Sequence, residues 1–124
     1  MREKKTLCSD TGLYKGFLEL LKLNTESLKN IEKCYQTMYS EETTKLLIEC
    51  SKSFIISYNN FSQEEKINNI NIIKNNLIEY ELILKVLVEL KILSIKQFSN
   101  LGILIGKIKG QIKGYEKKYT NIND

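Results

Sequence analysis

No proline occurs anywhere in the 124-residue chain. Proline breaks helices and is common in the loops of β folds, so its complete absence favours long, uninterrupted helices. The length is typical of one domain, and no Gly/Ser-rich linker or repeat divides the chain. We therefore predict a single all-α domain.

Apolar residues repeat with a helical period from Leu13 onward. Two series spaced seven apart interleave as the a and d positions of a heptad, namely Tyr14, Leu21, Leu28 and Tyr35, and Phe17, Asn24, Ile31 and Met38. This pattern predicts one helix over residues 13–38, about 39 Å long. Asn24, the polar member, is equally suited to cap a new helix, so a split into two helices stays open.

Three further helices are predicted, each from a capping residue and an apolar period. Ser40 precedes two acidic residues and predicts a helix over 41–58; Ser62 predicts a helix over 63–92. Ser94 and Gln97 form a capping box that begins a helix over 95–118. The residues expected to face inward are Leu47, Cys50, Phe54 and Phe61; Ile70, Ile73, Leu77, Tyr80, Leu84 and Leu87; and Phe98, Leu101, Ile105, Ile108, Ile112, Tyr115 and Tyr119.

Four amphipathic helices with short connections predict an antiparallel up-down four-helix bundle. The bundle is expected to span residues 13–119. Residues 1–12 are expected to be a flexible N-terminus, and residues 120–124 a polar tail.

The composition excludes several kinds of catalytic chemistry. The chain has no histidine, and its three cysteines, Cys8, Cys34 and Cys50, form no CxxC pair. We therefore expect no enzyme, no bound metal and no cofactor. Glu79, Glu81 and Glu89 are interpreted as solvated charges on a helix. Because the chain shows neither a signal peptide nor an apolar run of about 18 residues, we expect a cytoplasmic protein with no membrane partner.

Positive charge is concentrated near the C-terminal end. The net charge is only +4, but residues 91–119 contain seven basic residues and one acidic residue. Lysines release counterions when they neutralise phosphates, so this segment is a candidate nucleic-acid-binding face. The residues predicted to contact phosphates are Lys96, Lys107, Lys109, Lys113, Lys117 and Lys118.

Four glycines recur every fourth residue inside the last predicted helix, at Gly102, Gly106, Gly110 and Gly114. Each costs about 1 kcal/mol relative to alanine in a helix interior. At 100° per residue they lie away from the inward-facing seam and among the lysines. A bare helix surface lets another backbone approach closely, so two interpretations stay open: a helix of a neighbouring subunit packs there, or a phosphate backbone does. For the first, we predict an oligomer interface made of these glycines with Leu82 and Val86.

The segment from about Cys50 to Lys118 resembles one family of small four-helix-bundle proteins. The resemblance rests on ELKILSIKQF at residues 89–98 and IGKIKG at residues 105–110. These are similar to the third-to-fourth-helix junction and the I/V-G-R-x-L-G helix of the 23S rRNA intervening-sequence proteins and of the accessory variability proteins (Avd) of diversity-generating retroelements. Leu104 stands where the family has an acidic residue and Lys107 where it has arginine, so Lys107 offers a point charge instead of a bidentate contact.

The resemblance to Avd implies a non-catalytic homopentamer that binds a reverse transcriptase and RNA or DNA. Its implied role is to support cDNA synthesis in mutagenic retrohoming. The alternative is a helical interaction or adaptor protein of the rRNA intervening-sequence type, with no direct role in reverse transcription.

Overall fold

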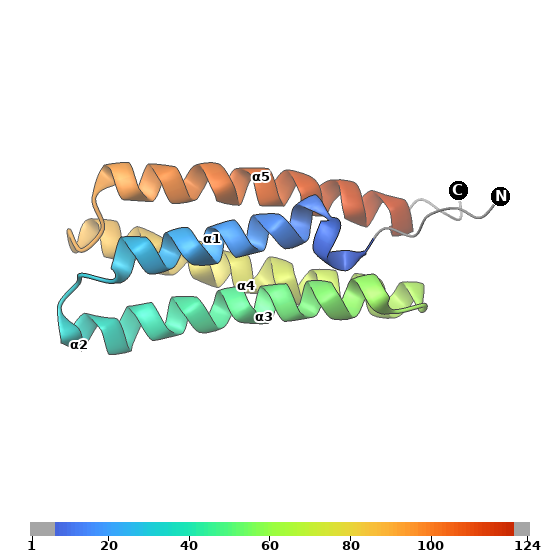
Figure 1. Ribbon diagram of the computed structural model, residues 1–124, viewed down its shortest axis with the longest axis horizontal. Helices are drawn as coiled ribbons and strands as arrows, with labels where there is room; N and C mark the ends of the chain where they lie inside the picture. The colour runs from blue at the N-terminus through green and yellow to red at the C-terminus, as the bar shows by residue number, and fades with distance from the viewer. Residues whose placement is uncertain (1–6, 121–124) are drawn as a thin grey trace.

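The computed structural model describes residues 7–120, which are helical apart from short connections and contain no strand. The long helices lie side by side (Figure 1). The elements in chain order are a 3-10 turn η1 (Cys8–Asp10), α1 (Gly12–Leu28), the short helix α2 (Lys33–Tyr35), a π-helical turn η2 (Gln36–Ser40), α3 (Glu41–Asn59), α4 (Gln63–Glu89) and α5 (Ile95–Thr120). The predicted all-α bundle is confirmed.

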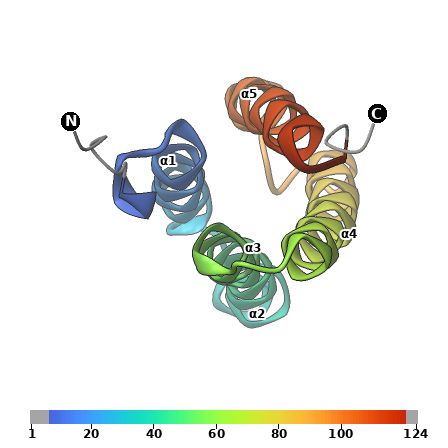
Figure 2. The same ribbon diagram turned by 90° about the vertical axis from the view of Figure 1, so that its right-hand side faces the viewer.

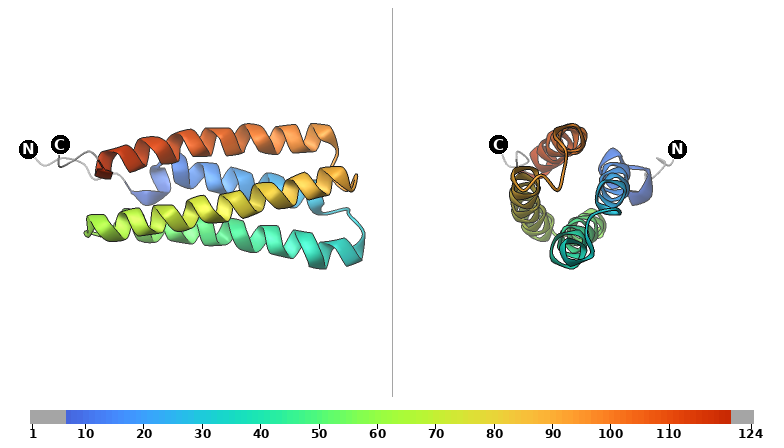
Figure 3. Two further views of the ribbon diagram at one scale, coloured as in Figure 1. Left: turned by 180° about the vertical axis from the view of Figure 1, so that it is seen from behind. Right: turned by 90° about the vertical axis from the view of Figure 1, so that its left-hand side faces the viewer.

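The long helices follow one another around the bundle in the order α1, α3, α4, α5, and consecutive helices run in opposite directions (Figures 1 and 2). Between α3 and α4, the Cys50 thiol lies 3.8 Å from the carbonyl oxygen of Ile73, and the Ser57 hydroxyl donates to the carbonyl of Lys66 at 3.0 Å. A later residue of α3 thus meets an earlier residue of α4. The view from behind shows α5 beside α4 along its length (Figure 3).

The core is a single apolar cluster to which all four long helices contribute. All six inward positions predicted for α4 are buried. Of the inward positions predicted for α5, Leu101, Ile105, Ile108 and Ile112 are buried, whereas Phe98, Tyr115 and Tyr119 are half-buried. The side chains that are less than 2 % exposed and largest are Tyr80, Phe17, Phe54, Leu20, Leu28, Leu47, Ile70, Ile73, Leu84, Leu87, Leu93 and Leu101.

The prediction of one helix over residues 13–38 is wrong, and so is the alternative split at Asn24. Helix α1 ends at Leu28, whereas Asn24 lies inside it and is fully buried. The side chain of Gln36 donates to the carbonyl oxygens of Lys29 (3.1 Å) and Ile31 (2.9 Å), which provides partners for two carbonyls of the loop that follows α1. The heptad spacing continues across this reversal, so it could not reveal it.

Ser40 does not begin a helix. Its φ and ψ of −67° and −46° are helical, and its side chain makes no capping bond. Elements α2, η2 and α3 form one continuous helical segment over residues 33–59, with a π-helical turn where the cap was expected. A π turn displaces the backbone hydrogen bonds of the helix. The carbonyl of Ser40 accepts a side-chain hydrogen bond from the Thr43 hydroxyl at 3.1 Å.

Other boundaries differ by smaller amounts. Residues 7–12, expected to be flexible, contain η1 and the Thr11 cap, whose hydroxyl accepts from the Tyr14 N–H at 3.3 Å. Helix α4 ends three residues early, and α5 continues two residues further, to Thr120. Phe61, predicted inward, lies in the α3–α4 connection and is 97 % exposed. The remainder of the predicted N-terminus, residues 1–6, and the predicted tail at residues 121–124 lie outside the described residues.

The two remaining predicted caps are confirmed. The Ser62 hydroxyl accepts from the Glu65 N–H at 3.3 Å. In the capping box, the Ser94 hydroxyl accepts from the Gln97 backbone N–H, and Oε1 of the Gln97 side chain accepts from the Ser94 backbone N–H, both at 3.0 Å. Gln97 also donates to the carbonyl of Ser27 at 3.5 Å, which joins the start of α5 to the end of α1.

Lys91 ends α4 in a left-handed backbone conformation, with φ of 61°. The N–H of Ile92 bonds to the carbonyl of Leu87 (2.9 Å) and the N–H of Lys91 to that of Val88 (3.0 Å), the two bonds of a Schellman motif. Glycine is the usual residue at this position because a Cβ is strained there.

We expect Lys91→Gly to raise the free energy of unfolding by about 1 kcal/mol, since glycine removes the cost of the left-handed conformation. Urea denaturation measures this change. Lys91→Ala is the control, because it removes the same charge and keeps the Cβ; a gain of equal size in both variants would show that backbone strain is not the cause.

Candidate functional site

All six predicted lysines lie on α5, and all are exposed. The helix carries one acidic residue, Glu116, whose carboxylate is bound by Lys74 of α4 at 2.6 Å. The charge concentration inferred from the sequence is therefore a property of one helix at the surface of the bundle.

One of the six lysines has an ion-pair partner. Lys109 bonds to Glu81 of α4 at 2.8 Å, with the two side chains 52 % and 36 % exposed. An exposed pair of this kind holds the two helices together weakly. For the other five lysines, no carboxylate within residues 7–120 lies at ion-pair distance, so their charges remain available to an anionic ligand.

The lysines follow two edges of the outer face of α5. At 100° per residue, Lys109, Lys113 and Lys117 form one row at a spacing of four residues, about 6 Å along the axis. Lys107 lies on the opposite edge, with Lys96 and Lys118 toward the two ends of the helix. The structure brings the six residues to one helix face, divided by a strip that carries no side chains.

That strip is the predicted glycine stripe, Gly102, Gly106, Gly110 and Gly114. All four residues are exposed, and a Cβ placed on any of them would meet nothing within 4 Å. None of the four therefore serves to let helices approach inside this bundle. Leu82 and Val86, the other residues predicted for an oligomer interface, are exposed on α4.

Two glycines that sequence reasoning missed lie where α1 packs against side chains of α5. A Cβ on Gly12 would lie 2.6 Å from the Gln111 amide nitrogen, and one on Gly16 would lie 3.2 Å from Cγ1 of Ile108. Both glycines are on α1 and face α5. Their spacing of four residues was a detectable signal of small-residue packing between helices.

We expect these two kinds of glycine to respond oppositely to substitution. Gly110→Ala should raise the free energy of unfolding by about 0.5–1 kcal/mol, because it improves helix propensity in open space. Gly16→Leu should lower it by about 1–3 kcal/mol, because the added atoms overpack the contact between α1 and α5. Urea denaturation of dilute protein measures both, and a loss in both variants would contradict the placement of the stripe.

A polar cluster that the sequence did not predict joins the end of α3, the start of α4 and the end of α5. The Lys66 ammonium donates to the carbonyls of Ser57 (3.0 Å) and Tyr58 (3.2 Å) and lies 5.0 Å from the ring centre of Tyr119. The hydroxyls of Ser57 and Tyr115 are 3.1 Å apart. These contacts cap α3 and fasten the last turns of α5, which carry Lys117 and Lys118.

Burial changes the titration of this cluster. It lowers the pKa of Lys66, and it raises the pKa of the Tyr115 phenol to about 12, although the hydrogen bond to Ser57 acts in the opposite direction. The Tyr115 phenol therefore stays protonated at neutral pH. Since Ser57 is buried, the cluster is suited to holding helices together and not to attacking a substrate.

Cys50 is not a nucleophilic site. Cys50 is fully buried, and burial together with the charge of Glu49 raises its thiol pKa to about 12, so the thiol stays protonated and unreactive. Cys34 is exposed and Cys8 half-buried. Within residues 7–120, no group of three or more cysteine, aspartate or glutamate side chains is placed to hold a metal ion.

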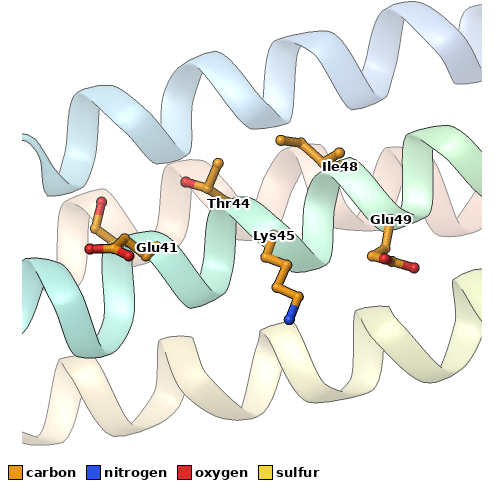
Figure 4. Close-up of a pocket in the computed structure, with 6 residues that line it drawn as sticks. Glu41, Thr44, Lys45, Ile48 and Glu49 are labelled. Carbon is orange, nitrogen blue, oxygen red and sulfur yellow. The ribbon is translucent and has the colours of Figure 1, made fainter.

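A shallow hollow of about 390 Å³ lies on α3, away from the lysines of α5. Its lining comprises Ser40, Glu41, Thr44, Lys45, Ile48 and Glu49. Thr44 and Ile48 point toward α1, whereas Lys45 points to the other side of the helix (Figure 4). These side chains do not converge on a common point, so the hollow offers no set of groups for binding or catalysis.

Two further observations bear on the kind of protein this is. Among the helices of residues 7–120, none combines the length and the apolar character needed to cross a lipid bilayer. Comparison of the chain with models of known protein families, with curated proteins and with solved structures finds no match.

Proposed function

We propose that this chain is a non-catalytic accessory protein that binds RNA or DNA through the lysines of α5. The observation that carries the proposal is the exposure of six lysines along one helix, five of them with no carboxylate at ion-pair distance within residues 7–120. Contacts of this type are made to phosphates and are independent of base sequence.

The partner enzyme follows from the resemblance to Avd. In this proposal the chain binds the reverse transcriptase of a diversity-generating retroelement and supports cDNA synthesis in mutagenic retrohoming. It acts in the cytoplasm as a homo-oligomer, a pentamer by the resemblance, with the glycine stripe, Leu82 and Val86 at its interfaces.

Genetic context and reconstitution test this role. We expect a reverse-transcriptase gene beside the coding sequence, and we expect that enzyme to make template-primed cDNA only when the chain is present. Equal cDNA yields with and without the chain would contradict the role in reverse transcription.

The exposed apolar side chains of α4 favour a second candidate, an adaptor of the rRNA intervening-sequence type. In that case protein partners would bind α4, and nucleic acid would have no effect. Stable protein complexes without measurable affinity for RNA or DNA would support this candidate.

A further inference from the structure

Four apolar side chains form an exposed ridge on the outer face of α4. They are Ile78, Leu82, Val86 and Leu90, with exposed fractions of 64 %, 64 %, 37 % and 53 %. Their spacing of four residues places them in one row along about 18 Å of helix. A contiguous apolar row of this kind marks an interaction surface. We refer to it as the α4 ridge.

The α4 ridge is flanked mainly by negative charge. Glu79 lies in the neighbouring row on one side. Glu89 lies on the other side, with Lys85 and with Glu81, whose carboxylate is already paired with Lys109 of the same chain. A partner surface must therefore accept an apolar row and carry positive charge at its edges.

The outer face of α5 on the same chain meets both requirements. The glycine stripe, residues 102–114, is as long as the ridge and follows the same row direction at the same spacing. Because a Cβ on any of its glycines would meet open space, the stripe is a groove between neighbouring rows. Its edges carry Lys107 and Lys113, which have no ion-pair partner among residues 7–120, and Lys109, which is paired with Glu81 of its own chain. The exposed Ile103 lies on the same edge as Lys107.

Charge decides which surfaces meet. A contact of stripe with stripe would bring the lysines of two copies together, and a contact of ridge with ridge would do the same for Glu79 and Glu89. Like charges that face each other across an interface are strongly unfavourable. Only the ridge of one copy on the stripe of another pairs opposite charges.

We propose that copies of this chain associate head to tail, with the α4 ridge of one copy seated in the α5 glycine stripe of the next. Rows of the same four-residue spacing interdigitate at a crossing angle of about −50°. Each copy keeps a free ridge or stripe, so the contact repeats and gives a ring if the rotation closes. This inference rests on the oligomer of the proposed function and supplies its two surfaces.

The contact is compatible with nucleic-acid binding by the same helix. Lys96 lies before the stripe, and Lys117 and Lys118 lie after it. These lysines remain outside the covered segment, where they stay available for phosphates.

Two neutral double variants test the proposal. Leu82→Gln with Val86→Gln disables the ridge, and Gly106→Gln with Gly110→Gln fills the stripe; none of these changes alters net charge or a buried residue. Ile56→Gln is the control, because Ile56 is also an exposed apolar residue but lies on α3. Sedimentation velocity at micromolar concentration measures the assembly of each protein alone and of the two double variants in equimolar mixture.

We expect the wild type and the control to assemble, and each double variant alone to sediment as a 14.5 kDa protomer. The mixture should form a dimer, because the intact ridge of one variant meets the intact stripe of the other. Assembly stops there, since the remaining ridge and the remaining stripe are the mutated ones. A monomeric wild type, double variants that still assemble, or a mixture that stays monomeric would each overturn the proposal. Nucleic-acid binding is measured separately, and its absence from the wild type would overturn the proposed function without changing the sedimentation result.

Discussion

Asn24→Ala is expected to lower the free energy of unfolding by about 2–4 kcal/mol, since it removes a fully buried side chain that hydrogen bonds to two other helices. The Asn24 amide nitrogen donates to the Thr43 hydroxyl at 2.9 Å, and the Tyr80 hydroxyl donates to the Asn24 carbonyl oxygen at 2.9 Å. Alanine would leave the Tyr80 hydroxyl without its partner and open a cavity between α1, α3 and α4.

The loss is expected to be large because the network is enclosed. Asn24, Thr43 and Tyr80 are each 0 % exposed, so water does not replace the missing bonds. Burial also raises the pKa of the Tyr80 phenol well above its usual range. The chain of bonds ends at the carbonyl of Ser40, which couples the network to the π-helical turn.

Urea denaturation of matched variants checks this expectation. Asn75→Ala is the control, because Asn75 is exposed on α4 and its loss should change stability by less than about 0.5 kcal/mol. Tyr80→Phe removes one hydrogen bond with little change in volume and should cost about 1–2 kcal/mol. Equal effects of Asn24→Ala and Asn75→Ala would show that the network contributes nothing to stability.

Replacing Lys107, Lys113, Lys117 and Lys118 with glutamine is expected to weaken nucleic-acid binding by about 10²–10³-fold at low salt. Each lysine that neutralises a phosphate releases counterions, and the loss of one contact reduces the salt slope by about 1. These four residues are exposed and have no ion-pair partner among residues 7–120, so their replacement should leave folding unchanged. Fluorescence anisotropy with labelled RNA and DNA measures the affinity.

The matched control replaces Lys15, Lys22, Lys45 and Lys52 with glutamine. These four lysines are exposed on α1 and α3, and their loss gives the same change in net charge. We expect only a several-fold loss of affinity for nucleic acid, because the lower net charge weakens the electrostatic attraction of the whole protein. If both quadruple variants lose affinity equally, binding depends on net charge and α5 is not the interface.

The sequence was sufficient to predict the parts of the fold that depend on local patterns. The apolar period of α4 places Tyr80 and Leu87 in the core, because only one face of such a helix can bury its side chains. The capping box at Ser94 could be predicted because its two hydrogen bonds join residues within one helical turn.

The reversal after Leu28 could not be predicted in the same way. Its connection preserves the heptad spacing, and two carbonyls of the loop accept hydrogen bonds from the side chain of Gln36, at the start of η2. The role of Asn24 could not be predicted either. A polar residue in an apolar seam suggests either a cap or a buried network, and only the positions of Thr43 and Tyr80 distinguish them.

The candidate site was predicted in part. Charge along the chain identified α5, and angular position placed its glycines outside the core, as observed. The sequence did not reveal that Lys109 is paired with Glu81, because that contact depends on the register between α4 and α5. The α4 ridge was identified only through Leu82 and Val86, since its spacing is visible but its exposure depends on which face the neighbouring helices cover.

The measurement that tests the nucleic-acid interface most directly is the dependence of wild-type affinity on salt concentration. With Lys96, Lys117 and Lys118 outside the contact between copies and available for phosphates, a plot of log K against log salt should have a slope of about −2 to −3 between about 50 and 200 mM salt. The α5 quadruple variant should reduce that slope to about −1. A wild-type slope near zero, or no binding at low salt, would contradict a role for α5 in binding nucleic acid.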